Sequence, residues 1–415
     1  MNAKYETEAV LSYFEALASA INQAWLLQNY NEDAFAAIAL HALTKSPPHN
    51  NVEYSQIIRW LACAKTIPQQ FKLDESFGQP PITMYSDGRF QIDVLFWHTA
   101  TTAIHQHGFS GAFAVLYGSS VQSTYEFDLR KKISGKFQLG TVKLSGCELL
   151  EKGAVREIGR GRTLIHSLFH LDTPSVTVVA RTSGDRETGP EYVYHVPALA
   201  LDPTRSDALM TKRLQSLNLL LKIGSPQLDE IAGTILAQSD IHTAYLVLLQ
   251  IRLRSADSDC YRRLFELACH RHGEDFASLA PAIEEERRRT IISARRNTIS
   301  NPAHRFFLAL LISLPDRESI YKLVRRRYPE HDVQLLIEQW VNAIAATDFL
   351  GIKVEGLGAR LFHYCLQDYS PEEITSRLAE FYTHEDIEGS VDDIRKLCVR
   401  LKQNPFLKAL FTRGV

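Results

Sequence analysis

The stretch TTAIHQHGFSGAFAVLYG, residues 101–118, places two histidines one residue apart inside an apolar segment that ends at a glycine. Alternate residues of a strand point to the same face of a sheet, so His105 and His107 would project their imidazoles to one side. An isolated pair of this kind is more often two polar residues on a solvent face. The apolar surroundings and the closing glycine favour metal ligands here, because neutral imidazole binds Fe, Zn, Cu, Ni and Mn.

A third ligand is available further along the chain. The stretch RTLIHSLFHLDTPSVTVV, residues 162–179, carries His166 and His170, and either could complete a three-histidine set from a strand across a barrel. Three protein ligands leave coordination positions open for chemistry. A second H-x-H, His270 and His272, is discounted because it falls at the predicted end of a helix, where residues i and i+2 diverge.

Length and composition exclude several classes of protein. With 415 residues, two or three domains are expected, and 45% hydrophobic and 23% charged residues are typical of a globular chain. A formal net charge of −2 gives no reason to expect nucleic acid or a membrane as a partner. The N-terminus lacks signal-peptide order. The six cysteines form no C-x-x-C pair, which argues against a zinc site or a disulfide framework and predicts a reducing, cytoplasmic location.

The hydrophobic pattern divides the chain into three parts and predicts an α+β protein. Residues 1–80 repeat apolar positions at three- and four-residue spacing, which is typical of helices. Residues 81–203 alternate with a period of two between frequent glycine turns, which predicts short strands in a sandwich or barrel. Residues 204–415 return to helical spacing without a clean repeat and predict a large irregular helical domain.

Finer predictions follow from the same patterns. In GRFQIDVLFWHT, residues 88–99, the strand has one apolar face and one mixed face. The apolar face consists of Phe90, Ile92, Val94 and Phe96, and the mixed face of Gln91, Asp93 and Leu95. Helix starts are predicted at Asn301, which precedes a proline, and at Ser370, which is followed by a proline and then by Glu373 in capping-box position.

The order of these features resembles the cupin superfamily: a strand, H-x-H, a glycine turn, several strands, and then a histidine before a proline-containing strand. Within that superfamily, residues 87–118 are most similar to the cysteine (thiol) dioxygenases, which are three-histidine non-haem iron enzymes. The resemblance covers about residues 84–185. It implies a cupin-type β-barrel, the double-stranded β-helix, over residues 81–203, with His105, His107 and His166 as the metal ligands.

The same resemblance indicates which ligands and which kind of substrate the metal would bind. Many cupins have a glutamate ligand four or five residues after H-x-H, where this chain has Gly111 and Ala112. A metal held by three neutral imidazoles keeps its 2+ charge and can take an anionic, chelating substrate beside O2. The last strand of the family carries Ser, His and Tyr where this chain has Thr177, Val179 and Arg181. Free cysteine is therefore not the predicted substrate.

Further side chains are candidates for the pocket. Tyr117 and Tyr125 would point inward, where a hydroxyl could hold a substrate or an oxygen-derived group, although simple packing explains them as well. His170 would act as a hydrogen-bond partner at the site or would lie on the surface. Trp97 and His98 would contact substrate, although ordinary core packing explains Trp97 equally well. Arg181 would bind its anionic group, or would instead reach solvent or Asp185. The predicted catalytic residues are therefore Tyr117, Tyr125 and His170.

Two functions remain open on this reading. The first is a mononuclear non-haem oxygenase, with Fe(II) as its metal, acting on a small anionic chelating substrate and O2. The alternative is a non-oxidative metal-dependent cupin, an isomerase, lyase or ligand-binding module, which could hold Zn, Ni, Mn or Cu instead. In either case the C-terminal helices would recognise or cover the barrel, form a homo-oligomer, or contact a carrier protein.

Overall fold

The computed structural model of the chain has the α+β composition that the sequence predicts. It divides into two compact units, residues 1–291 and residues 292–415. The first unit holds the N-terminal helices, the strands and the helices that follow them, whereas the second is helical. The structure describes residues 3–71, 73, 77–99, 103–183, 190–203, 207–255, 257–345, 350–351, 354–380 and 391–414.

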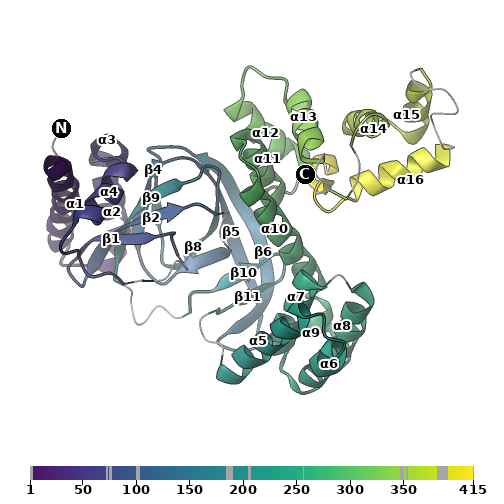
Figure 1. Ribbon diagram of the computed structural model, residues 1–415, viewed down its shortest axis with the longest axis horizontal. Helices are drawn as coiled ribbons and strands as arrows, with labels where there is room; N and C mark the ends of the chain where they lie inside the picture. Colours follow the sequence, from purple (N-terminus) through teal and green to yellow (C-terminus); the bar gives the residue numbers. More distant parts are fainter. Residues whose placement is uncertain are drawn as a thin grey trace. The chain divides into compact units, whose positions relative to one another are not determined.

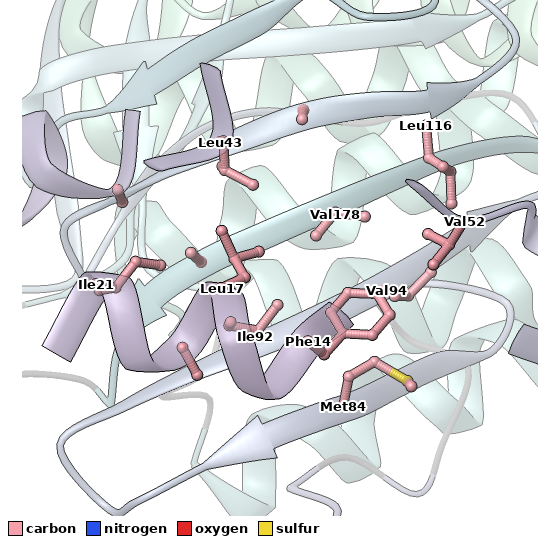
Figure 2. Close-up of a cluster of buried hydrophobic side chains, with 14 of the residues drawn as sticks. Phe14, Leu17, Ile21, Leu43, Val52, Met84, Ile92, Val94, Leu116 and Val178 are labelled. Carbon is pink, nitrogen blue, oxygen red and sulfur yellow. The ribbon is translucent and has the colours of Figure 1, made fainter. Parts of the chain in front are cut away.

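The N-terminal helices form a layer against a β-sheet (Figure 1). They are α1 (Ala3–Leu26), α2 (Glu32–Lys45), α3 (Pro48–Asn51) and α4 (Tyr54–Cys63). Figure 2 shows Phe14 and Leu17 of α1 directed toward Ile92 and Val94 of the sheet, and all four side chains are buried in one core. The helices end at Cys63, before the predicted boundary at residue 80, and their helical spacing reflects apolar faces that the sheet covers.

The strands form a five-stranded sheet and a closed six-stranded barrel, and the named strand pairs are antiparallel. The sheet has the order β1–β2–β9–β4–β7. Its strands are β1 (Pro81–Ser86), β2 (Phe90–Trp97), β4 (Gly111–Tyr117), β7 (Val155–Ile158) and β9 (Ser175–Thr182). The barrel has the order β10–β11–β6–β5–β8–β3. Its strands are β3 (Ile104–His107), β5 (Ser120–Lys132), β6 (Phe137–Leu150), β8 (Gly161–His170), β10 (Val193–His195) and β11 (Leu199–Leu201).

Strand β2 alternates as predicted. Its apolar face joins the core shared with the N-terminal helices, and this face consists of Phe90, Ile92, Val94 and Phe96. Asp93, Leu95 and Trp97 point to the other side, where they line a pocket with residues of β3 and β8. The five-stranded sheet is thus covered by helices on one face and lies opposite part of the barrel on the other.

Two faces of the barrel strands have different surroundings. One buried cluster takes side chains from all six barrel strands and so fills the barrel: Ile104, Tyr125, Phe127, Val142, Ile165, Tyr192, Tyr194 and Ala200. We call it the barrel core. Sequence neighbours along a strand point to opposite faces, so His105 and His166, which follow Ile104 and Ile165, point out of the barrel core. They face the five-stranded sheet and line the pocket between the two.

A second helical layer packs on the outside of the barrel at β6 and β11 (Figure 1). It consists of α5 (Ala208–Lys222), α6 (Leu228–Gln238), α7 (Ile241–Arg254), α8 (Ser258–His272) and α9 (Glu274–Ala277). Phe137 and Leu199 of the barrel share one buried cluster with Leu217, Tyr245 and Leu248 of these helices. The predicted boundary at 203/204 is a change of secondary structure, and the first compact unit continues through it to residue 291.

Truncation tests the importance of this layer. A chain that ends at residue 203 would expose the apolar outer face of β6 and β11, and we expect it to aggregate. A chain that ends at residue 291 keeps the layer and should stay monodisperse with its far-UV spectrum intact. Light scattering of the two purified fragments makes the comparison. Equal solubility of both fragments would show that the helices α5–α9 are dispensable for the barrel.

The second unit contains the helices after α10 (Ala280–Thr298), which spans the boundary between units. These are α11 (Pro302–Ser313), α12 (Arg317–Arg327), α13 (Val333–Ala345), α14 (Leu357–Leu366), α15 (Pro371–Leu378), α16 (Val391–Lys402) and α17 (Lys408–Phe411). Both predicted helix starts are confirmed: Asn301 caps α11, and Ser370 and Glu373 form a capping box on α15. Within the described residues, no helix is both long enough and apolar enough to cross a bilayer.

Candidate metal centre

The barrel brings the three predicted ligands together. His105 and His107 lie on β3, and His166 lies on the neighbouring strand β8, directly opposite His105 in the register. An irregularity in the pairing follows His105, so that His107 lies opposite Gly161. His107 and His166 are 5% and 3% exposed. Among the described residues, these three histidines are the one group of metal-ligating side chains that could hold an ion.

The distances place three ligand nitrogens around one point. The Nε2 atoms of His107 and His166 lie 2.9 Å apart, and the ligand nitrogens of all three residues lie within 4.8 Å of one another. Two metal–nitrogen bonds of about 2.0–2.1 Å at a right angle separate their nitrogens by about 2.9 Å. A single N–H···N hydrogen bond would give the same contact between His107 and His166. It would leave the third nitrogen of the cluster unexplained.

That third nitrogen belongs to His105. Its Nδ1 lies 2.9 Å from the carbonyl oxygen of Ala103, which fixes the ring and leaves Nε2 as the coordinating atom. His105 Nε2 is buried and has no hydrogen-bond partner among the described residues, and the same is true of His166 Nδ1. A buried polar atom without a partner is costly. An ion coordinated by His105 Nε2 would remove that cost, so the donor set fits a bound metal.

The electrostatic surroundings keep these imidazoles in their ligating form. Burial lowers the pKa of His105, although the Ala103 carbonyl and the charge of Glu191 oppose it. Burial lowers the pKa of His107 well below the ordinary histidine value, and the other two imidazoles and the Arg181 guanidinium act in the same direction. Burial and His105 likewise lower the pKa of His166. All three rings are therefore neutral near pH 7, the state that binds metal.

The pocket beside the histidines is small and mostly apolar. Its cavity measures about 40 Å³. Side chains from both the five-stranded sheet and the barrel line it, together with those of two connecting segments: Phe77, Asp93, Leu95, Trp97, Phe109, Phe113, Ile158, Leu168, Thr177, Val179 and Arg181. Measured in this way, one water molecule needs about 10–15 Å³, so the free space suits an ion with a few small ligand groups.

Arg181 and Asp93 provide the charged groups of the pocket. Arg181 Nε donates a hydrogen bond of 2.9 Å to Asp93 Oδ2, and the guanidinium stacks 4.8 Å from the ring of Phe109. Thr83 and Gln91 donate further hydrogen bonds to the same carboxylate. Arg181 lies on the pocket face of β9, and its partner is Asp93. The alternative partner, Asp185, lies outside the described residues.

Trp97 and His170 form a stacked pair at the edge of the site. Their ring centroids are 4.8 Å apart with an interplanar angle of 14°, and Trp97 Nε1 donates to Thr177 Oγ1 at 3.1 Å. His170 Nδ1 lies 2.8 Å from Ser120 Oγ, and its side chain is fully buried. His170 is therefore not part of the three-nitrogen cluster. Trp97 lines the pocket, and His170 stacks on the Trp97 ring without lining the pocket itself.

Three predicted site residues lie elsewhere. Tyr117 is 41% exposed and packs on Tyr54, because the pairing of β4 with β9 shifts register after Val115 and turns the tyrosine away. Tyr125 belongs to the barrel core, because β5 and β4 lie in different sheets and their inward faces do not coincide. His98 is exposed just after the end of β2. The prediction that Tyr117 and Tyr125 point into the pocket is wrong.

Sequence reasoning missed the roles of Asp93, Phe109 and Gln106. The role of Asp93 could have been inferred from the sequence. A carboxylate on the face of β2 opposite its apolar side chains requires a buried partner. Phe109 lines the pocket under Arg181, two residues after the H-x-H. Gln106, the central residue of the H-x-H, points the opposite way from its neighbouring histidines, so no ligand pattern could reveal it.

Gln106 ties β3 to the segment 190–195. Its backbone N–H donates to Tyr192 O at 3.1 Å, its Nε2 donates to Pro190 O at 2.9 Å, and its Oε1 accepts from the Tyr194 hydroxyl. The amide of Gly108 adds a hydrogen bond of 3.0 Å to the carboxylate of Glu191. These contacts hold the backbone of β3 and thereby fix the direction in which both of its histidines project.

We expect Gln106→Leu to lower metal affinity without touching a ligand. Loss of its two side-chain hydrogen bonds frees β3 and should weaken binding about 10- to 100-fold, as loss of outer partners does in metal sites. Titration with a competing chelator measures the affinity. Asn404→Leu is the matched control, because Asn404 is also a buried amide that donates to a backbone carbonyl, that of Leu350, but lies in the second unit. Equal losses in both variants would refute a specific role for Gln106.

The arrangement can hold one divalent ion between three neutral imidazoles, beside an apolar cavity with a single neutralised ion pair. Such an ion keeps its full charge and its open coordination positions, which is the requirement for binding and polarising a small ligand.

Comparison of the chain with known proteins found no relative. No family model matches the chain, and no curated protein matches it either.

Proposed function

We propose that the protein is a mononuclear non-haem iron oxygenase of cupin type, which acts with O2 on a small, anionic, metal-chelating substrate. The observation that carries the proposal is the convergence of three buried, neutral histidine nitrogens on one point of a small apolar pocket. His105, His107 and His166 would hold Fe(II), which supplies open positions where substrate and O2 can bind side by side.

The ligand set supports a site with open coordination positions. His105, His107 and His166 offer three ligand nitrogens, and a metal with three protein ligands keeps positions free for other groups. Three protein ligands beside open positions are typical of non-haem Fe(II) oxygenases.

The charges of the pocket support an anionic substrate. The ligands are neutral, and Arg181 is balanced by Asp93, so a bound divalent ion would leave the pocket with two uncompensated positive charges. Among the described residues Asp93 is the hydrogen-bond partner of Arg181, through Nε, which leaves the terminal Nη groups for a substrate carboxylate or a similar anion. The apolar walls exclude water and strengthen both interactions.

The cavity limits the size of the substrate. With a free volume of about 40 Å³, it admits a molecule of few non-hydrogen atoms unless side chains move. Trp97 on β2 and Phe113 on β4 contribute apolar walls from the same sheet, and Thr177 holds the indole of Trp97 in place. These residues would orient the substrate's carbon chain, while its donor atoms point to the histidines.

Metal reconstitution under anaerobic conditions tests the proposal. The full-length protein loaded with Fe(II) should bind about one ion per chain. Nitric oxide, a stable substitute for O2, should then give the electron paramagnetic resonance signal of a high-spin iron nitrosyl, which reports an open position next to the histidines. Small carboxylates bearing a thiol, hydroxyl or amine should change that signal, and at least one should cause O2 uptake.

Two results would decide against an oxygenase. Tight binding of zinc or nickel, with no nitrosyl signal after loading with iron, would favour the non-oxidative alternative. A nitrosyl signal that no carboxylate perturbs, together with no O2 uptake across the panel, would leave a metal site without the proposed substrate class.

A further inference from the structure

Two cysteines of the second unit meet in its interior. Cys365 lies on α14 and Cys398 on α16, 33 residues apart in the sequence, and their Sγ atoms are 3.5 Å apart. They are 0% and 4% exposed. Their spacing matches no cysteine motif, so the sequence alone predicts no relation between them. The pair also lies outside the unit that holds the three histidines and takes no part in the proposed oxygenase.

The two thiols are chemically unequal. The Cys365 thiol donates a hydrogen bond to Cys398 Sγ, and this bond lowers the pKa of Cys398 while burial opposes it. The ammonium group of Lys402, one turn further along α16, lowers the pKa of Cys398 as well. The same hydrogen bond and burial raise the pKa of Cys365. The hydrogen bond and Lys402 favour Cys398 as the thiol that becomes the thiolate, with Cys365 as the proton donor beside it.

The geometry allows the two sulfurs to bond. A disulfide has a sulfur–sulfur distance of about 2.05 Å, so the atoms must approach by about 1.5 Å for the bond to form. Helices α14 and α16 already pack against each other in the core of this unit, where Leu361 and Leu401 are also buried. A crosslink here would join two segments that are distant in sequence.

We propose that Cys365 and Cys398 are a redox-active dithiol that a hydroperoxide oxidises to a disulfide. The Cys398 thiolate attacks one oxygen of hydrogen peroxide, the O–O bond breaks, and the departing oxygen leaves as water with the proton that the thiol had lost. Cys365 then attacks the resulting sulfenic sulfur, the S–S bond forms, and the S–OH oxygen leaves as water with the proton of Cys365. Two thiols lose two electrons, and one peroxide becomes two waters.

Peptide mapping of the full-length protein tests this. The reduced protein is treated with hydrogen peroxide, denatured in the presence of an alkylating reagent, digested without reductant and analysed by mass spectrometry. We expect a peptide containing Cys365 linked to one containing Cys398, lighter by two hydrogens than the sum of both, and separated again by dithiothreitol. Cys63 is exposed and serves as the internal control that the oxidant was active.

Single variants assign the two roles. In Cys365→Ser the linked peptide should be lost and Cys398 should accumulate as a sulfenic acid that dimedone traps. In Cys398→Ser the linked peptide should be lost and dimedone should not label Cys365. Cys260→Ser, a buried cysteine of the first unit, should leave the linked peptide unchanged. Oxidation of Cys63 in the wild-type protein without any Cys365–Cys398 linkage would overturn the proposal, whatever the folding of the variants.

Discussion

Replacing His107 by alanine is expected to strip the protein of its metal. His107 is the central ligand of the cluster, 2.9 Å from His166 and with its ring centroid 4.6 Å from that of His105. Loss of a ligand should weaken binding by more than the 10- to 100-fold that loss of an outer partner costs. Metal content, measured by mass spectrometry after gel filtration, should fall from about one ion per chain to near background, while the far-UV circular dichroism stays unchanged.

The matched control is His170→Asn. His170 is equally buried and lies on the same strand as His166, but it stacks on Trp97 outside the nitrogen cluster. This variant should keep its metal, with at most a modest loss of stability from the weaker stacking. The ligand assignment fails if His170→Asn empties the site while His166→Asn does not, because the third ligand would then be His170. Full metal content in His107→Ala would refute the site itself.

The sequence alone predicts the two metal ligands that lie close together in the chain, His105 and His107. His105 and His107 share a face through alternation alone, which depends on no other part of the chain. His166 was one of two candidates, and only the pairing of β3 with β8 places it opposite His105. Long-range pairing of this kind has no local signal. The assignment of His166 over His170 therefore came from the resemblance to cupins, and the geometry of the nitrogens agrees with it.

The failed predictions have a common physical cause. Tyr117 would share the inward face of Phe113 if β4 kept a constant register, but the irregularity after Val115 breaks the alternation. Tyr125 follows the alternation of its own strand, yet that strand belongs to the other sheet. A period of two tells which residues share a face, and it says nothing about what the face covers.

Domain organisation shows the same limit. The changes of period near residues 80 and 203 mark real changes of secondary structure. Neither interrupts the first compact unit, because the helices on both sides complete cores begun by the strands: Leu17 with Val94, and Leu248 with Leu199. The pattern of an amphipathic helix indicates that one of its faces is buried, but it does not identify the surface against which that face packs.

The ion pair of Asp93 and Arg181 leads to the second large expected effect. Asp93→Ala removes the carboxylate that balances Arg181 beside His107. It also leaves the hydrogen-bond donors of Thr83 and Gln91 without that partner. Removing one member of a buried pair costs about 3 kcal/mol or more, because the remaining charge is uncompensated. We expect a clearly lower midpoint in urea unfolding and weaker metal binding, since an unbalanced cation then lies next to the site.

A second substitution separates structure from function. In the double variant Asp93→Leu with Arg181→Met, both charges are gone and apolar side chains of similar size remain, so most of the lost stability should return. Metal binding should return as well, because the added positive charge is gone. Perturbation of the iron nitrosyl signal by small carboxylates should not return, because the Nη groups that bind the anion are missing. Arg181→Lys should keep stability near the wild-type value yet lose carboxylate binding, since an ammonium group cannot reproduce the planar fork of the guanidinium. Carboxylate binding that survives in both variants would assign the anion to the metal alone, and Arg181 would then serve the fold through Asp93 and Phe109.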